Sequence, residues 1–463
     1  MASFASGKPH CAMTPDPHLD GLLAHAVRRP DVFIRVTAAL ARHQAAASAA
    51  RAREGRSLGP VDGLRVSWKD LFDIEGTATT CGSRLTTRQP ARADAAAVAR
   101  LAAAGAVCIG KTNLSEFAFN GLGTNPNFGT PRNPVFPRSE DRLCGGSSSG
   151  AAAAVALGLC ELAIGTDTSG SVRVPAALCG LLGFRASGHR YPQAGLWTLS
   201  PTLDTIGLIS GQMAWIRAVD EALTDIADRD EPCRGPYEAP QFLLDVDPHL
   251  EPAVSAALVR FAEALRDAGY RVEHAPHAHL AAVQTLFDKH GTLVGYEALD
   301  SIGHQVARGQ TALLDSRVGE RLHEAQRRLT PTALETLHAE RLSLMHRQEQ
   351  LSENVVFLAA TTPMPAPRMG ELASARHFHA HNRRILSLTM PASFLDMPAI
   401  SVPIGRDEEG APIGAQMSVP QGRDRFLLHL AASLENDGLF TVSSSPDDHT
   451  ASQTPSAQCF ARL

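Results

Sequence analysis

The fold of this chain is decided between residues 144 and 175, where the sequence reads Cys144-Gly-Gly-Ser-Ser-Ser-Gly150, then an alanine-rich run, then Gly165-Thr-Asp-Thr-Ser-Gly-Ser-Val-Arg-Val-Pro175. Two glycine- and serine-rich turns thus bracket about three turns of predicted helix. Glycine permits backbone torsions that other residues avoid, and small residues let one backbone approach another. Hydroxyl and N–H groups therefore gather at both turns. A flexible Gly/Ser linker is the alternative, but linkers do not frame an apolar helix.

Composition places the chain among ordinary globular proteins. It has 463 residues, 44% hydrophobic and 20% charged, with a formal net charge of −5. A slightly acidic chain gives no reason to expect a nucleic-acid or membrane partner. The N-terminus shows no signal peptide, and no apolar run reaches the ~18 residues of a membrane span. We therefore expect a cytoplasmic protein.

Eight cysteines are spread along the chain without a Cys-x-x-Cys pair. In a chain of this length the pattern predicts reduced thiols that are mostly small core residues. Several of the nineteen histidines lie close together, as at His377, His379 and His381, where a spacing of two is poor geometry for metal ligands on a helix. No Gly-Lys-Ser/Thr follows the glycines at 145 and 146, so a phosphate cradle is not indicated. We predict no metal and no cofactor.

Residues 1–57 predict a helical N-terminal preface, because Leu19, Leu22, Leu23, Val27, Val32 and Val36 fall at loosely helical spacing. The turn at Gly59-Pro60 opens the compact domain, and residues 64–68 alternate as a strand that runs into Lys69. A lysine is almost never fully buried without a partner. The residues alone therefore favour a side chain whose amino group reaches solvent.

Helices followed directly by strands predict an α/β fold. Residues 94–105 read as a capped helix, and residues 106–110 follow as a strand. We expect a single mixed, mostly parallel central sheet covered by helices on both faces. The segment 228–240, rich in Pro, Asp and Arg, divides the domain at 58–440 into halves at 58–227 and 228–440. Residues 441–463 predict a disordered tail.

The two turns, in this order and spacing, resemble the signature of the amidase signature family. The resemblance covers residues from about 60 to about 435, with further matches in family order at Val66-Ser-Trp-Lys-Asp70, Gly110-Lys-Thr-Asn-Leu-Ser-Glu-Phe-Ala118, Gly129-Thr-Pro-Arg-Asn-Pro134, Leu203-Asp-Thr-Ile-Gly207 and Pro398-Ala-Ile-Ser-Val-Pro403. The Gly/Ser-rich turn alone would be a weak signal, whereas the combination is specific. The resemblance implies the single large fold of that family over 58–440.

The resemblance also implies a Ser–Ser–Lys catalytic triad. Ser171 takes the place of the nucleophile, Ser147 that of the bridging serine preceded in the family by a cis peptide, and Lys69 that of the base. The backbone N–H groups of the family's oxyanion hole correspond to Thr168, Ser169, Gly170 and Ser171, and Asp167 and Arg173 are expected to support the turn. Serine stands at 169 where the family usually has glycine, and Cys144 stands where proline is frequent.

These residue types suit amide hydrolysis. A serine hydroxyl is weakly nucleophilic and needs an adjacent base. Lysine can be that base only when it is neutral, which burial favours by lowering its pKa. A second hydroxyl can relay the proton because it donates and accepts at once. The lysine then helps to protonate the leaving nitrogen.

The leading hypothesis is a free-standing amidase that hydrolyses a carboxylic C–N bond of a small-molecule amide through an acyl-enzyme. The alternative is the glutaminase-type component of a tRNA-dependent amidotransferase complex. A binding protein that has kept the fold is a third hypothesis, which the intact triad disfavours. We keep a homodimer open as its assembly. The substrate is not determined, and its pocket is expected from segments 111–134, 188–204 and 280–350.

Overall fold

The computed structural model describes residues 17–86, 89–137, 139–224, 239–303, 313–351, 354–440 and 442. Apart from residue 442, the predicted tail at 441–463 lies outside these residues, as does most of the predicted break at 228–240. Five cysteines fall within them, and all five are buried and free, as predicted: Cys81, Cys108, Cys144, Cys160 and Cys179.

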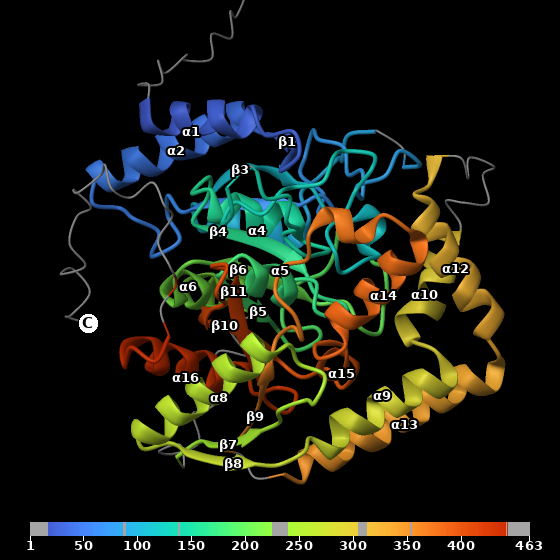
Figure 1. The fold of residues 1–463 in the computed structure, drawn as a ribbon. Helices are drawn as coiled ribbons and strands as arrows, with labels where there is room; N and C mark the ends of the chain where they lie inside the picture. The colour runs from blue at the N-terminus through green and yellow to red at the C-terminus, as the bar shows by residue number, and fades with distance from the viewer. Residues whose placement is uncertain are drawn as a thin grey trace, which may run out of the picture.

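One sheet runs through the molecule (Figure 1). Its strands are β1 Phe33–Val36, β2 Arg65–Lys69, β3 Val107–Thr112, β4 Leu162–Thr166, β5 Leu182–Arg185, β6 Ile206–Ser210, β7 Gln241–Leu244, β8 Arg271–His274, β9 Val355–Ala360, β10 Ala399–Arg406 and β11 Pro412–Ser418. They lie in the order β1-β3-β2-β4-β6-β5-β10-β11-β9-β7-β8. Both predicted halves therefore contribute to one sheet, and the boundaries at 57 and 227 stay predictions.

The sheet is mixed, as predicted, but it is not mostly parallel. Of the ten strand pairings in the described residues, six are antiparallel and four are parallel. A short turn joins β10 to β11, and a loop without a helix joins β5 to β6. Parallel neighbours need a long crossover, whereas direct connections of this kind return the chain antiparallel. The prediction was wrong because it extended the helix–strand pattern of residues 94–112 to the whole sheet.

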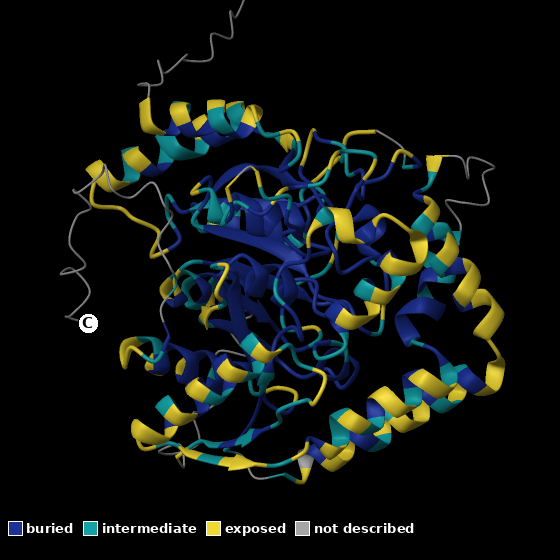
Figure 2. Ribbon diagram, viewed as in Figure 1, coloured by how far each residue is buried: buried dark blue, intermediate teal, exposed yellow. Residues whose placement is uncertain are grey.

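Helices cover both faces of the sheet, as predicted. They are α1 Pro17–Val27, α2 Ala38–Arg53, α3 Ala96–Ala103, α4 Ser149–Ala156, α5 Arg173–Leu178, α6 Met213–Leu223, α8 Pro252–Asp267, α9 Ala278–His290, α10 Leu293–Ser301, α12 Ser316–Arg328, α13 Pro331–Glu349, α14 Ala375–Leu386, α15 Met390–Phe394 and α16 Asp424–Asn436, with 3₁₀ turns η1 Glu116–Ala118 and η3 Met369–Leu372. Figure 2 shows the buried sheet between exposed helices.

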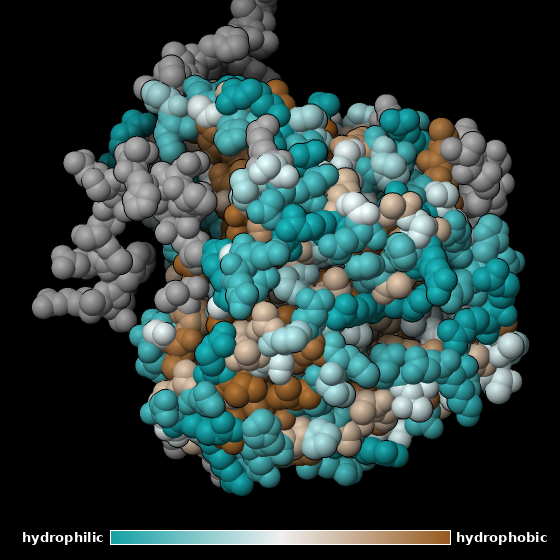
Figure 3. All heavy atoms as spheres, in the orientation of Figure 1, coloured by the Kyte–Doolittle hydropathy of each residue, from teal (hydrophilic) through white to brown (hydrophobic). Residues whose placement is uncertain are grey.

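Side chains alternate along each strand, so the two faces of the sheet belong to different clusters. Val107 and Ile109 of β3 pack with α1 and α4 on one face. Leu162 and Ile164 of β4 pack on the other face, in the cluster that includes α3, α6, α8 and α16. Hydrophilic side chains predominate outside this core on the face drawn in Figure 3. In the described residues, no helix combines the length and apolar character needed to cross a bilayer.

The N-terminal segment departs from its prediction at one element. Residues 33–36 were expected in a helix but form β1, which pairs antiparallel with β3. The spacing of Val32 and Val36 fits helix and strand alike, and the unpaired edge of β3 decides in favour of a strand. The preface is therefore two helices and an edge strand.

A buried arginine ties the turn after β4 to the C-terminal part of the chain. Arg173 forms an ion pair with Asp167 (2.9 Å), and both side chains have no exposed surface. The same guanidinium donates to the Thr389 carbonyl (3.2 Å), to Ser393 Oγ (2.6 Å) and to Gln416 Oε1 (2.5 Å). Asp167 and Arg173 were expected to support the turn, and the contacts of the Arg173 side chain connect α5 to α15 and β11.

We predict that Arg173→Met lowers the free energy of unfolding by about 3–5 kcal/mol, because it removes the closer partner of the buried Asp167 and leaves only Arg185, whose Nε lies 3.8 Å from Asp167 Oδ1. The control is Arg271→Met, because Arg271 pairs with Glu273 at the surface, where their side chains are 72% and 53% exposed. That change should cost less than about 1 kcal/mol. Denaturant unfolding of both variants measures the difference. Equal stabilities for the two would contradict a bracing role for Arg173.

Candidate active site

Lys69 lies at the carboxyl end of β2, with no exposed surface. Its Nζ donates to Ser147 Oγ (2.7 Å) and to Thr166 Oγ1 (2.8 Å), and lies 3.4 Å from the Thr166 carbonyl. β2 runs between β3 and β4, which puts the end of the strand inside the protein. The lysine is therefore buried, as the family resemblance implied and contrary to what the residues alone favoured.

The surroundings of Lys69 favour its neutral form. Burial lowers the pKa of this amine to about 7, and the carboxylates of Asp204 and Asp167 oppose the shift from a distance. Within the described chain no carboxylate forms an ion pair with Lys69. A neutral amine has a lone pair, so it can accept a proton near neutral pH.

A second buried lysine, Lys111, has the contacting carboxylate that Lys69 lacks. Lys111, on the neighbouring strand β3, forms a buried ion pair with Asp70 (2.6 Å) and donates to Thr79 Oγ1 (2.8 Å). Sequence reasoning missed this pair, although Asp70 directly follows Lys69. The chain thus gives Lys111 a contacting carboxylate and gives Lys69 only hydroxyl and carbonyl oxygens.

Ser147 is held by its backbone against Lys69. The peptide bond between Gly146 and Ser147 is cis, as the resemblance implied. A Cβ on Gly146 would lie 2.4 Å from the Gly123 nitrogen, so only glycine fits beside that backbone. The Ser147 carbonyl accepts from the Ser115 N–H (3.1 Å). The side chain therefore reaches the lysine from a backbone that is fixed on both sides.

Ser171 lies on the adjacent turn, between β4 and α5. Its carbonyl accepts from the Ser148 N–H (3.1 Å), so the two glycine- and serine-rich turns touch. The residue is only 4% exposed. In the part of the chain that the structure describes, the Ser171 hydroxyl makes no hydrogen bond. The structure thus joins Lys69 to Ser147 directly and brings Ser171 beside them through its backbone.

The turn from 168 to 171 offers backbone donors, but not all four that were expected. The Gly170 N–H donates to Asp167 Oδ1 (2.7 Å) and is therefore already occupied. The N–H groups of Thr168, Ser169 and Ser171 have no acceptor among the described residues. Buried N–H groups are nearly always paired, so three unpaired ones in one turn indicate a place for a ligand oxygen.

Two further residues of this site escaped sequence reasoning. Thr166 ends β4 and hydrogen-bonds Lys69 through its hydroxyl. Asp204 accepts from Thr168 Oγ1 (2.5 Å) and from the Leu199 N–H (2.7 Å), and burial raises its pKa to about 6. Asp204 lies inside a stretch that was quoted for the family resemblance, and Thr166 lies in the signature turn itself. Their contacts, however, depend on tertiary structure that no local pattern reveals.

A cavity of about 600 Å³ reaches this turn at Ser169. Its wall includes Phe119 and residues of α9, α10, α12 and α14. The expected segments 111–134 and 280–350 therefore both contribute, whereas 188–204 does not and residues 379–390 were not foreseen. Trp197, in the segment 188–204, packs on Phe117 with ring centroids 5.3 Å apart.

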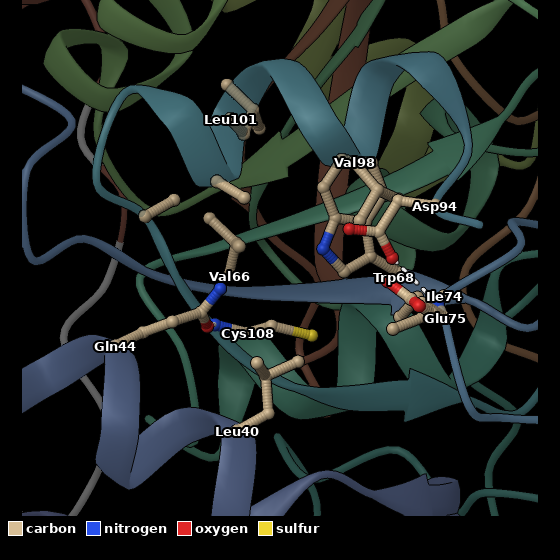
Figure 4. A pocket seen from close by; sticks show the side chains of 12 residues that line it. Leu40, Gln44, Val66, Trp68, Ile74, Glu75, Asp94, Val98, Leu101 and Cys108 are labelled. Carbon is tan, nitrogen blue, oxygen red and sulfur yellow. Dashed lines mark hydrogen bonds between the residues drawn. The ribbon is translucent and has the colours of Figure 1, made fainter. Parts of the chain in front are cut away.

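A smaller cavity of about 200 Å³ lies on the other face of β2 (Figure 4). Val66 and Trp68 line it from β2, Gln44 from α2 and Leu101 from α3. Side chains alternate along a strand, so Lys69 points to the opposite face from Trp68. The sheet therefore separates this cavity from the lysine.

Known proteins resemble this chain over most of its length. The Amidase family model matches residues 24–428. The 2-amino-5-chloromuconic acid deaminase of Comamonas testosteroni is 33% identical, over 86% of each chain. The A component of the glutamyl-tRNA(Gln) amidotransferase of Synechococcus sp. (strain RCC307) is 31% identical, over 87% of this chain and 89% of that one. A crystal structure of an amidase superposes with a TM-score of 0.79 at 30% identity, covering 90% of this chain and 95% of the other.

Proposed function

This chain belongs to the amidase signature family and hydrolyses carbon–nitrogen amide bonds, and we propose that it does so through an acyl-enzyme on Ser171. Lys69 is the base in this proposal, and Ser147 relays the proton between Lys69 and Ser171. The observation that carries it is the 2.7 Å hydrogen bond from a fully buried amine to Ser147 Oγ. Such an amine can be neutral at working pH, as proton relay requires.

In the first half-reaction, Ser171 Oγ attacks the carbonyl carbon of the amide. Its proton passes to Ser147 Oγ while the proton of Ser147 passes to Lys69 Nζ. The carbonyl oxygen becomes an oxyanion, and the free N–H groups of Thr168, Ser169 and Ser171 are the donors we assign to it. Donors aimed at developing charge are often the largest catalytic contribution.

The tetrahedral intermediate then collapses with cleavage of the C–N bond. The proton held by Lys69 returns through Ser147 to the leaving nitrogen, which departs as ammonia or an amine. Water next attacks the ester on Ser171 and gives its proton to the same relay. The carboxylic acid leaves, and Ser171 regains its proton.

A second candidate is the glutaminase-type component of a tRNA-dependent amidotransferase, which the 31% identity to the Synechococcus protein favours. In that case glutamine hydrolysis would depend on a different protein that co-purifies with the chain. An assay of glutamine hydrolysis, with the protein purified alone and from its native source, separates the two. Hydrolysis of other amides by the chain alone supports the free-standing enzyme.

We predict that Ser171→Ala lowers kcat by about 10⁴-fold or more, because the acyl-enzyme cannot form. Hydroxylamine should intercept acyl transfer in the wild type but not in this variant, and intact-protein mass spectrometry should find an acyl group on Ser171. Ser149→Ala is the matched control, since Ser149 is a buried serine of the same site region that the relay does not use. Undiminished activity in Ser171→Ala would rule the mechanism out.

We also predict that kcat/KM rises with pH through about 7 and then levels off. Only neutral Lys69 accepts a proton, and the neutral fraction grows as pH rises through its pKa of about 7. A profile that is flat from about pH 5.5 to about 8.5, or that falls as pH rises, would contradict the assignment of Lys69 as the base.

The pKa of Asp204 is about 6, close to that of Lys69, so a variant of Asp204 is the control for the pH dependence of kcat/KM. Its carboxylate raises the pKa of Lys69, so Asp204→Asn should move the ascending limb to lower pH without removing it. Loss of the limb in Asp204→Asn would instead assign the titration to Asp204. Rate–pH profiles of the two proteins on one amide decide between these outcomes.

A further inference from the structure

The cavity at Ser169 carries an excess of positive charge. Helices α9, α10, α12 and α14 line it, and these helices lie on one side of the molecule (Figure 1). Four arginines and two carboxylates line the space, and one of the arginines, Arg384, pairs with Glu251 outside the lining, which leaves one positive charge unbalanced. At about 600 Å³ it is large enough for a small organic ligand. A ligand-sized cavity with unbalanced positive charge suits an anion.

Two of the four arginines are already engaged. The Arg328 guanidinium donates to the Asp288 carbonyl (2.7 Å) and the Phe287 carbonyl (3.3 Å). Arg384 pairs with Glu251 at 3.2 Å. These contacts hold both side chains in place, although the Arg328 guanidinium keeps its charge, since both of its hydrogen bonds come from Nη2 and go to neutral carbonyls. Arg321 and Arg383 form no ion pair in the part of the chain that the structure describes.

Arg321 is held in place by Phe119. Its guanidinium carbon lies 3.8 Å from the centroid of the Phe119 ring, and Nη1 donates to the Phe119 carbonyl. The other donors of this half-buried group have no acceptor among the described residues. A guanidinium fixed on an aromatic ring, with several N–H groups to spare, is suited to bind a carboxylate through two parallel hydrogen bonds.

A second cation lies close to Arg321. Burial lowers the pKa of Arg321 to about 10, Glu324 opposes the shift, and the positive charge of Arg383 adds to it. A pKa of about 10 leaves Arg321 charged at neutral pH. Like charges that face one cavity repel each other, and a bound anion relieves that repulsion.

The same cavity touches the turn that we assign to the oxyanion. Ser169, whose N–H is among the three free donors, lines the cavity. Its carbonyl accepts from Thr389 Oγ1 (2.7 Å), which fixes the peptide unit between the cavity and Ser171. A ligand in this space therefore lies next to the reacting group.

We propose that the cavity is the substrate pocket, and that it selects amides which also carry a carboxylate, with Arg321 as the anchor and Arg383 as a second contact. This inference rests on the proposed function. The substrate class is the monoamides of short dicarboxylic acids and amides of similar shape and charge. Arg321 acts on substrate selection and takes no part in proton transfer.

The test compares each acidic amide with a neutral amide of the same carbon number, for example glutaramic acid with pentanamide. The wild type should have the higher kcat/KM for the acidic member. Arg321→Gln should lower the acidic-to-neutral ratio of kcat/KM by about 10- to 100-fold, because hydrogen bonds to a charged group are lost. Arg383→Gln should lower it by about 3- to 10-fold. Arg327→Gln, one residue before Arg328 on α12 and exposed, is the control and should leave the ratio as it is.

Two results would overturn the pocket assignment. One is a wild type that prefers the neutral amides. The other is an Arg321→Gln variant that loses activity equally on both members of a pair, which would mean that Arg321 only supports the loop at Phe119. Failure of the acyl-enzyme mechanism is distinct, since it would appear as activity of Ser171→Ala on either substrate. Inhibition of pentanamide hydrolysis by free glutarate adds a readout, and its inhibition constant should rise about 10-fold in Arg321→Gln.

Discussion

The site depends on one constraint, which is that Lys69 is buried without a contacting carboxylate. A shift of its pKa from 10.5 to about 7 corresponds to about 5 kcal/mol of preference for the neutral amine. Lys111 lies on the next strand and is equally buried, but it has Asp70. The two lysines therefore differ in role. Lys111 forms a structural ion pair with Asp70, whereas Lys69, which contacts only hydroxyl and carbonyl oxygens, can accept a proton.

The rest of the fold buries the Lys69 amine and positions it beside the two glycine- and serine-rich turns. β2 places Lys69 between the neighbouring strands β3 and β4, the close approach of Gly146 to Gly123 fixes Ser147, and the Asp167–Arg173 pair fixes the turn before α5. Asp167 also accepts a hydrogen bond from the Gly170 N–H, and this N–H is therefore not free to bind a ligand. The Asp167 carboxylate thus supports the turn and also fixes the backbone that carries the free N–H groups of Thr168, Ser169 and Ser171.

Sequence reasoning reached part of this arrangement. The apolar periodicity placed α3 and β3 within a few residues, and the two glycine- and serine-rich turns located the site. Local pattern alone put Lys69 in solvent, and only the family resemblance moved it inside. Strand direction was wrong because pairing depends on connections between distant segments. Thr166, Asp204 and the Asp70–Lys111 pair were missed because side-chain contacts across strands leave no periodic signal. The arginine-lined cavity combines helices that are distant in sequence, so it too needed the fold.

The most direct test of this account is the pKa of Lys69 itself. The chain has only four lysines, Lys8, Lys69, Lys111 and Lys289, so lysine labelled with ¹³C at Cε gives few signals to assign. An NMR titration, with Lys69→Met to identify the signal, measures this pKa in the folded protein. We predict a midpoint near 7 for Lys69. A midpoint near 10.5, the value of an ordinary lysine, would contradict it.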